Sequence, residues 1–229
     1  MKDFNTYINE KLKLSKSTAK KVDEFVDLGL SVKWAKYNLG VDPNNLEKPE
    51  DWYGDYYSWG ETQTKDDYGV ADYKWAGLQH DHVTKYCPKN KSFKWDGNTT
   101  VPDDLISLEK DDDVAFVKSD GEYRMPTKEE CAELSKVPHK WQTKYAGIKG
   151  LQGMLFTAEN GNELFIPAAR FKTAVGQSIT DDIDGDVWSS NLSIHEPNCA
   201  YCLIVSEHGS VAGNSFSRNL GFSIRGVKK

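Results

Sequence analysis

The chain has 229 residues, of which 38% are hydrophobic and 12% aromatic, and a net charge of -6. A chain of this length and composition can bury a core, so we expect a globular protein. The negative charge argues against a nucleic-acid partner, because phosphate binding requires concentrated lysine and arginine. No apolar run reaches the roughly 18 residues that a membrane-spanning helix needs, and the first residues lack the apolar centre of a signal peptide. We therefore expect synthesis and folding in the cytoplasm, with four reduced thiols: Cys87, Cys131, Cys199 and Cys202.

The first 22 residues differ from the remainder in charge and in pattern. Six lysines against two acidic residues give this segment a charge of +4 and leave -10 for residues 23–229. Its apolar residues follow the spacing of one helical face, and they are Phe4, Tyr7, Ile8 and Leu12. We interpret residues 1–22 as an amphipathic, basic peg and linker, whose apolar face is an assembly anchor. A solvated terminus is the alternative. Residues 23–229 then form one domain.

The body of the chain begins with an apolar, partly alternating stretch over residues 25–35, which predicts a first strand pair. Residues 52–62 contain five aromatic side chains. Such rings either stack on sugars or fill a core, and we favour packing, since buried aromatics are the usual way in which a loop-rich fold obtains a core. Residues 62–102 are polar and without helical period, which predicts a long surface loop.

Two helix starts follow. Residues 111–113 are three aspartates before an apolar run, a pattern that favours the N-terminus of a helix. Thr127 and Glu130 have the spacing of a capping box, which predicts a helix from residue 128 to about residue 137 with Cys131 and Leu134 facing inward.

The remaining sequence predicts strands. Residues 141–157 indicate two strands with glycine-containing turns, and Asn160 with Gly161 predicts a hairpin turn before a return strand over residues 163–167. Alternation from residue 199 onward, with a turn near His208 and Gly209, predicts a C-terminal antiparallel meander. Short antiparallel strands with few helices and long loops are typical of the α+β class.

Four short blocks occur in a fixed order: residues 123–127 (YRMPT), 164–169 (LFIPAA), 187–190 (VWSS) and 221–225 (GFSIR). They resemble the RMPT, LPAAG, WSSS and GFSVR series of the major paralogous domain family of gut and rumen bacteria. The resemblance implies a C-type-lectin-like fold, related to formylglycine-generating enzymes and to retroelement-diversified variable proteins, and a non-enzymatic binding module. Residues 7–18 resemble N-terminal peptides of gut bacteriophage proteins, which implies a virion protein on the particle surface.

Two motifs suggest other chemistry. Cys199 and Cys202 have the spacing of a zinc or redox half-site, but residues three apart on a strand point to opposite faces, so we favour buried thiols. Residues 196–198 are the Glu-Pro-Asn tripeptide of calcium-dependent lectins, and the acidic residues 181–186 offer oxygen ligands, although we favour a solvated turn there. The Trp-Asn-Asp segment that such lectins also use is Val-Ala-Gly here, at residues 211–213. We expect no cofactor, with calcium as the alternative.

In the implied fold, the segment between residues 188–190 and the final strand forms an exposed binding surface. The predicted ligand-binding residues there are Ser193, His195, Glu196, Asn198, Tyr201, Glu207, His208, Asn214, Ser217 and Arg218. We expect a host-surface glycan or protein as ligand and other virion proteins as partners of the anchor. An oligomer is possible, and its state is left open. The alternatives are a capsid or tail decoration protein without a ligand and, more distantly, a formylglycine-generating-like oxidase.

Overall fold

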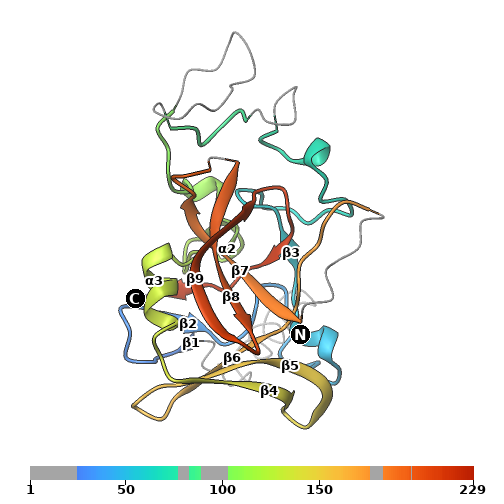
Figure 1. Ribbon diagram of the computed structural model, residues 1–229, viewed down its shortest axis with the longest axis vertical. Coiled ribbons are helices and arrows are strands. Elements are labelled where there is room, and N and C mark those ends of the chain that lie inside the picture. Colours follow the sequence, from blue (N-terminus) through green and yellow to red (C-terminus); the bar gives the residue numbers. More distant parts are fainter. Residues whose placement is uncertain (1–24, 77–82, 89–102, 176–182, 197) are drawn as a thin grey trace, which may run out of the picture.

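The computed structural model describes residues 25–76, 83–88, 103–175, 183–196 and 198–229 (Figure 1). In these ranges three β-sheets are accompanied by two short α-helices and three 3-10 turns. The fold is thus mostly β-sheet with few helices, which agrees at this coarse level with the predicted class. The peg over residues 1–22 and its anchor residues Phe4, Tyr7, Ile8 and Leu12 lie outside the described residues.

A five-stranded sheet lies at the centre, in the order β3-β10-β7-β8-β9. Its strands are β3 (Tyr56–Tyr57), β7 (Asp184–Leu192), β8 (Cys199–Ser206), β9 (Gly209–Ser217) and β10 (Phe222–Ser223). The predicted meander is confirmed for β8 and β9, which are antiparallel neighbours, and β7 pairs antiparallel with β8 on its other side. It is wrong for β10, which pairs in parallel with β7. The ring of Phe222 stacks on Trp188 of β7 at 4.0 Å between centroids and is fully buried. β10 therefore lies beside β7, on the side of the sheet opposite to β9.

A second sheet, in the order β4-β5-β6, lies at the end of the molecule where β8 turns into β9 (Figure 1). Its strands are β4 (His139–Tyr145), β5 (Ile148–Thr157) and β6 (Glu163–Pro167). The predicted Asn160–Gly161 turn joins β5 to β6, and Gly161 has the positive φ of 81° that such a turn requires. The end of β6 packs against the start of β7, where the backbone of Gly185 lies so close to the carbonyl oxygen of Pro167 that a Cβ would not fit.

The third sheet joins the two ends of the described domain. It contains β1 (Phe25–Val26), β2 (Lys33–Ala35) and β11 (Val227–Lys228), with β2 in the middle. The predicted first strand pair is confirmed, since Phe25 is the register partner of Ala35.

The helices begin where the capping residues predicted. Asp113 caps α2 (Val114–Lys118) by accepting a 3.0 Å hydrogen bond from the Phe116 N–H. Thr127 and Glu130 form the capping box of α3 (Lys128–Leu134), which ends three residues before the predicted position. The predicted inward-facing residues of α3, Cys131 and Leu134, are fully buried.

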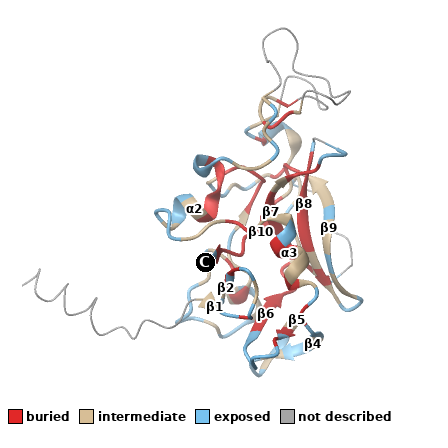
Figure 2. Ribbon diagram, turned by 90° about the vertical axis from the view of Figure 1, so that its left-hand side faces the viewer, coloured by how far each residue is buried: buried red, intermediate tan, exposed pale blue. Residues whose placement is uncertain are grey.

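Two cores lie on opposite faces of the central sheet. Leu203 of β8 contributes to the first core, with Cys131 of α3 and Phe156 of β5. Cys202 contributes to the second, with Trp59 and Trp188. Figure 2 shows β7 and β8 buried along most of their length, whereas β9 is intermediate or exposed.

The aromatic stretch over residues 52–62 packs, as favoured from the sequence. The Trp59 indole donates to the carbonyl of Ser189, and the Trp188 indole donates to the carbonyl of Tyr57, both at 2.9 Å. The prediction of a surface loop over residues 62–102 is wrong for part of this stretch. The buried tyrosines Tyr68, Tyr73 and Tyr86 are drawn into the protein, where their hydroxyls donate to two backbone carbonyls and to Asp112.

Candidate functional site

The ten predicted ligand-binding residues do not form one surface. They divide between the two ends of the β8–β9 hairpin, which are about 23 Å apart at about 3.3 Å per strand residue. We call the end where β8 begins and β9 ends the loop end. Its exposed or half-buried members are His195, Glu196, Asn198 and Ser217. The other end is the hairpin turn, where Glu207 and His208 are exposed. Asn214 lies between them on β9 and is exposed.

Three of the ten residues are buried, so their predicted place on an exposed surface is wrong. Ser193 closes the β7–β8 loop by accepting a hydrogen bond from the Glu196 N–H at 3.2 Å. The ring of Tyr201 is covered by Lys128 of α3, whose Nζ lies 3.9 Å from the ring centroid. A polar residue type does not reveal whether its side chain points inward, and both Ser193, in the loop after β7, and Tyr201, on β8, are buried.

Arg218 is the third buried residue. Its guanidinium donates to the carbonyl oxygens of Lys85 at 3.1 Å and Tyr86 at 3.4 Å, and it lies near the rings of Trp59 and Tyr73. Backbone carbonyls and aromatic faces therefore replace water around part of this cation, whereas its Nε and Nη2 have no hydrogen-bond partner among the described residues. The residue stabilises the fold at the loop end.

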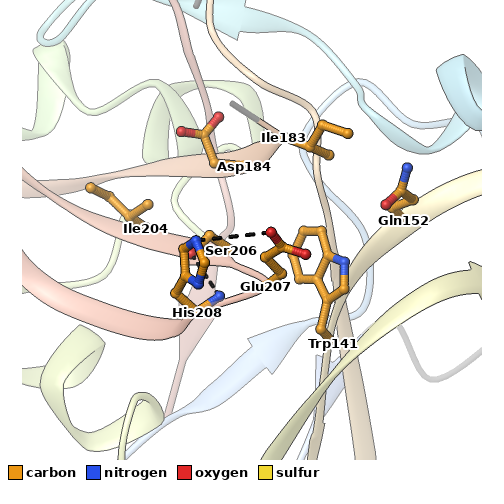
Figure 3. A pocket seen from close by; sticks show the side chains of 8 residues that line it. All are labelled: Trp141, Gln152, Ile183, Asp184, Ile204, Ser206, Glu207 and His208. Carbon is orange, nitrogen blue, oxygen red and sulfur yellow. Dashed lines mark hydrogen bonds and ion pairs between the residues drawn. The ribbon is translucent and has the colours of Figure 1, made fainter. Parts of the chain in front are cut away.

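A pocket of about 390 Å³ lies beside the hairpin turn, and we call it the hairpin pocket (Figure 3). It contains Glu207 and His208, two of the predicted residues. Sequence reasoning missed its other members, which come from β4, β5 and β8 and from β7 with its lead-in: Trp141, Gln152, Ile183, Asp184, Ile204 and Ser206.

Strand register explains how the pocket is assembled. On β7 and β8, Asp184 is the partner of Ser206, and residues directly opposite on antiparallel strands share a face. On β4 and β5, Trp141 is the partner of Met154, and Gln152 is two residues from Met154, so Trp141 and Gln152 also share a face. Ile204 packs against the second core and Trp141 against the first, so the pocket lies around the end of the hairpin, beside both faces.

The hairpin turn holds its two polar side chains at the pocket. The backbone N–H of His208 donates to the Ser206 hydroxyl at 3.3 Å, and Gly209 follows with a φ of 133°. The His208 Nε2 lies 3.9 Å from a Glu207 carboxylate oxygen, an ion pair when the imidazole is protonated (Figure 3). Both side chains are mostly exposed, so they remain accessible to a ligand.

A buried carboxyl lies next to the pocket on the same face of the sheet. Asp186 is two residues from Asp184 and is the register partner of Ile204, which lines the pocket. It is 1% exposed, and its Oδ2 has no hydrogen-bond partner among the described residues. Burial, with a smaller contribution from the charge of Asp184, raises the pKa of Asp186 to about 8.

The acidic stretch over residues 181–186 is therefore not a solvated turn in its described part. Asp184 and Asp186 belong to β7, and Asp186 is buried; residues 181 and 182 lie outside the described ranges. Glu196 and Asn198 of the Glu-Pro-Asn tripeptide are exposed at the loop end, and Pro197 is not described. Within the described ranges, no three histidine, cysteine or acidic side chains converge as metal ligands.

The four cysteines are free and buried. Cys199 and Cys202 lie three residues apart on the regular strand β8, so their thiols leave opposite faces, as expected. Burial raises the pKa of Cys199 to about 11, and it raises the pKa of Cys131 further. These thiols are protonated at neutral pH and are poor nucleophiles.

The hairpin pocket thus combines an indole ring with carboxylate, amide, imidazole and hydroxyl groups. This set can bind a small polar ligand through one flat apolar face and several hydrogen bonds. In the described part of the chain, no helix has the length and apolar character needed to cross a bilayer. Comparison with family models, with curated proteins and with solved structures gave no match for this chain.

Proposed function

We propose that this chain is a non-enzymatic ligand-binding module that takes one sugar unit of a host-surface glycan into the hairpin pocket. The observation that carries the proposal is the placement of one indole, Trp141, among five hydrogen-bonding side chains around a pocket of about 390 Å³. Pockets for small ligands commonly measure about 300–1,000 Å³ and carry a few convergent polar groups.

The chemistry of the lining suits a sugar ring. A pyranose has an apolar C–H face, which stacks on a flat aromatic ring, and an edge of hydroxyls, each of which donates and accepts hydrogen bonds. Asp184 and Glu207 accept from hydroxyls, and the Gln152 amide both donates and accepts. The half-buried indole of Trp141 supplies the stacking face.

We also propose that the domain has a C-type-lectin-like fold. The blocks that carry the family resemblance support this, because three of them pack on one another. Met125, Trp188 and Phe222 belong to the same core, although they are far apart in the sequence. A shared signature at mutually packed positions fits a common fold.

Display on a bacteriophage particle, with the N-terminal peg as the anchor, is a proposal that the sequence of residues 1–22 alone supports. A peg deletion tests it. We expect the truncated protein to fold and to bind ligand as before while its incorporation into particles is lost. Unchanged incorporation would contradict the anchor.

Glycan-array screening tests the binding function, with the wild-type chain beside Trp141→Ala. We expect binding by the wild type, unaffected by EDTA, and loss of that binding in the variant. Loss of binding with EDTA would show that calcium takes part. Silence of the wild type on a broad array would contradict the proposal and favour a decoration protein without a ligand.

A further inference from the structure

The charge around the hairpin pocket is predominantly negative. Asp184 and Glu207 line it, and His208 is its one described cationic group when protonated. Among the described lining residues, none is a lysine or an arginine. Lys140 precedes Trp141 on β4, but adjacent strand residues point to opposite faces, so its side chain leaves the strand away from the pocket face.

Asp186 adds a further carboxyl behind this lining. It projects from the same face of β7 and β8 as Asp184, Ile204 and Ser206, which line the pocket. Its Oδ2 is buried without a hydrogen-bond partner among the described residues. With its pKa raised to about 8, Asp186 holds its proton at about pH 6, so the negative charge that a ligand meets comes from Asp184 and Glu207, which line the pocket.

The aromatic residue of the pocket also favours a cation. The face of an indole ring carries partial negative charge and attracts ammonium groups, more strongly than other aromatic side chains do. In Figure 3, the Trp141 ring is drawn among the side chains of the pocket, together with the carboxylates of Glu207 and Asp184. An ammonium group has three donors and no acceptor, so it complements oxygen acceptors and the ring face together.

We propose that the sugar bound in the hairpin pocket carries a free ammonium group, so that the preferred ligand is an amino sugar. This inference rests on the proposed function and names the ligand class of the same site. N-acetylation removes the charge, and a uronic acid reverses it. The pocket therefore discriminates between sugars by charge as well as by shape.

The test is calorimetric titration of the full chain at about pH 6 with matched sets of methyl glycosides. Each set contains the free amino sugar, its N-acetyl derivative and the neutral parent sugar, in the gluco, galacto and manno series. We expect the amino sugar of the bound series to have a Kd about tenfold lower than its two relatives, a difference of about 1.4 kcal/mol. We expect the preference to shrink as salt is added, because salt screens the exposed carboxylate.

Two matched variants locate the effect. Glu207→Gln keeps a hydrogen-bonding side chain and removes its charge, so the preference for the amino sugar should fall about threefold or more. Glu196→Gln makes the same change at the loop end and should leave the preference unchanged. Glu207 and Glu196 are both exposed, so neither change threatens folding.

The outcomes separate the two proposals. If the N-acetyl or neutral sugars bind in the pocket as tightly as the amino sugar, the ammonium inference is overturned and the sugar-binding function stands. If Glu196→Gln lowers the preference for the amino sugar as much as Glu207→Gln does, the preference does not depend on the charge at the hairpin turn. If none of the sugars in any series binds, the proposed function fails, and this inference fails with it.

Discussion

The two ends of the β8–β9 hairpin carry similar residue types and use them differently. At the loop end, Arg218 turns inward and donates to the carbonyls of Lys85 and Tyr86. At the hairpin turn, Glu207 and His208 remain exposed beside the pocket. A polar side chain that is buried among the protein's own carbonyls and rings supports the fold, whereas side chains that stay exposed beside a pocket are accessible to a ligand. Four predictions test this comparison.

The largest expected effect concerns Asp186. Its folded-state pKa of about 8 lies above the roughly 3.9 of an unfolded aspartate, so the folded protein holds the proton more tightly. The contribution of this group to stability is therefore fully present below about pH 4 and is lost as the pH rises through about 8, a change on the order of 5 kcal/mol. Asp186→Asn removes this dependence. Urea unfolding at a series of pH values should give the variant a flatter profile and greater stability than the wild type above pH 7.

The matched control is Asp66→Asn, an exposed aspartate outside the pocket. It should follow the wild-type profile. If the wild type and Asp186→Asn show the same slope, then Asp186 is ionised in the folded protein at neutral pH, and the hairpin turn carries more negative charge than we infer.

The second effect concerns the loop end. Arg218→Ala removes the donor to two carbonyls and empties a space between aromatic rings, which should lower the free energy of unfolding by about 3 kcal/mol. Ligand affinity should be unchanged in the fraction that is folded. Lys118→Ala, at an exposed position of α2, should shift the unfolding free energy by less than about 0.5 kcal/mol. A loss of affinity with unaltered stability would place Arg218 in the binding site instead.

The third effect concerns Trp141, the aromatic side chain that lines the pocket. Trp141→Ala should weaken sugar binding at least about tenfold, because it removes the stacking face. Trp141→Phe keeps a smaller ring and should retain part of the affinity. Circular dichroism checks that both variants are folded, since Trp141 also packs partly against the first core. If the wild type and a folded Trp141→Ala bind the sugar with equal affinity, the ring does not contribute to ligand binding.

The smallest effect compares the two histidines. His208→Gln should change sugar affinity by about two- to fivefold, because one hydrogen-bonding group at an exposed turn contributes roughly 0.5–1 kcal/mol. His195→Gln is the same substitution at the loop end, where it should have no effect. Titration of both variants with the bound sugar gives the comparison, and a larger effect of His195→Gln would reverse our assignment of the two ends.

Local chemistry allowed much of the fold to be predicted. The Thr127–Glu130 capping box and the Asn160–Gly161 turn were found from the sequence because each depends on residues within one turn of chain. The parallel pairing of β10 with β7 was missed, because it depends on the distant stacking of Phe222 on Trp188.

The pocket was found only in part for the same reason. Glu207 and His208 were predicted because they are polar residues in the segment that the family resemblance implies to be exposed. Trp141, Gln152 and Asp184 come from three strands, and only the meeting of two sheets brings them together. A polar residue among apolar strand positions was the available signal for Asp184, and its acidic neighbours suggested a solvated turn instead.

The most direct test of the account is an ¹⁵N NMR titration of the folded chain with the amino sugar that binds best. We predict chemical-shift changes at the Trp141 indole and at the backbone amides of Gln152, Ser206, Glu207 and His208. Changes confined to His195, Glu196 and Asn198, with the hairpin turn unaffected, would show that the loop end binds the ligand and would contradict the account.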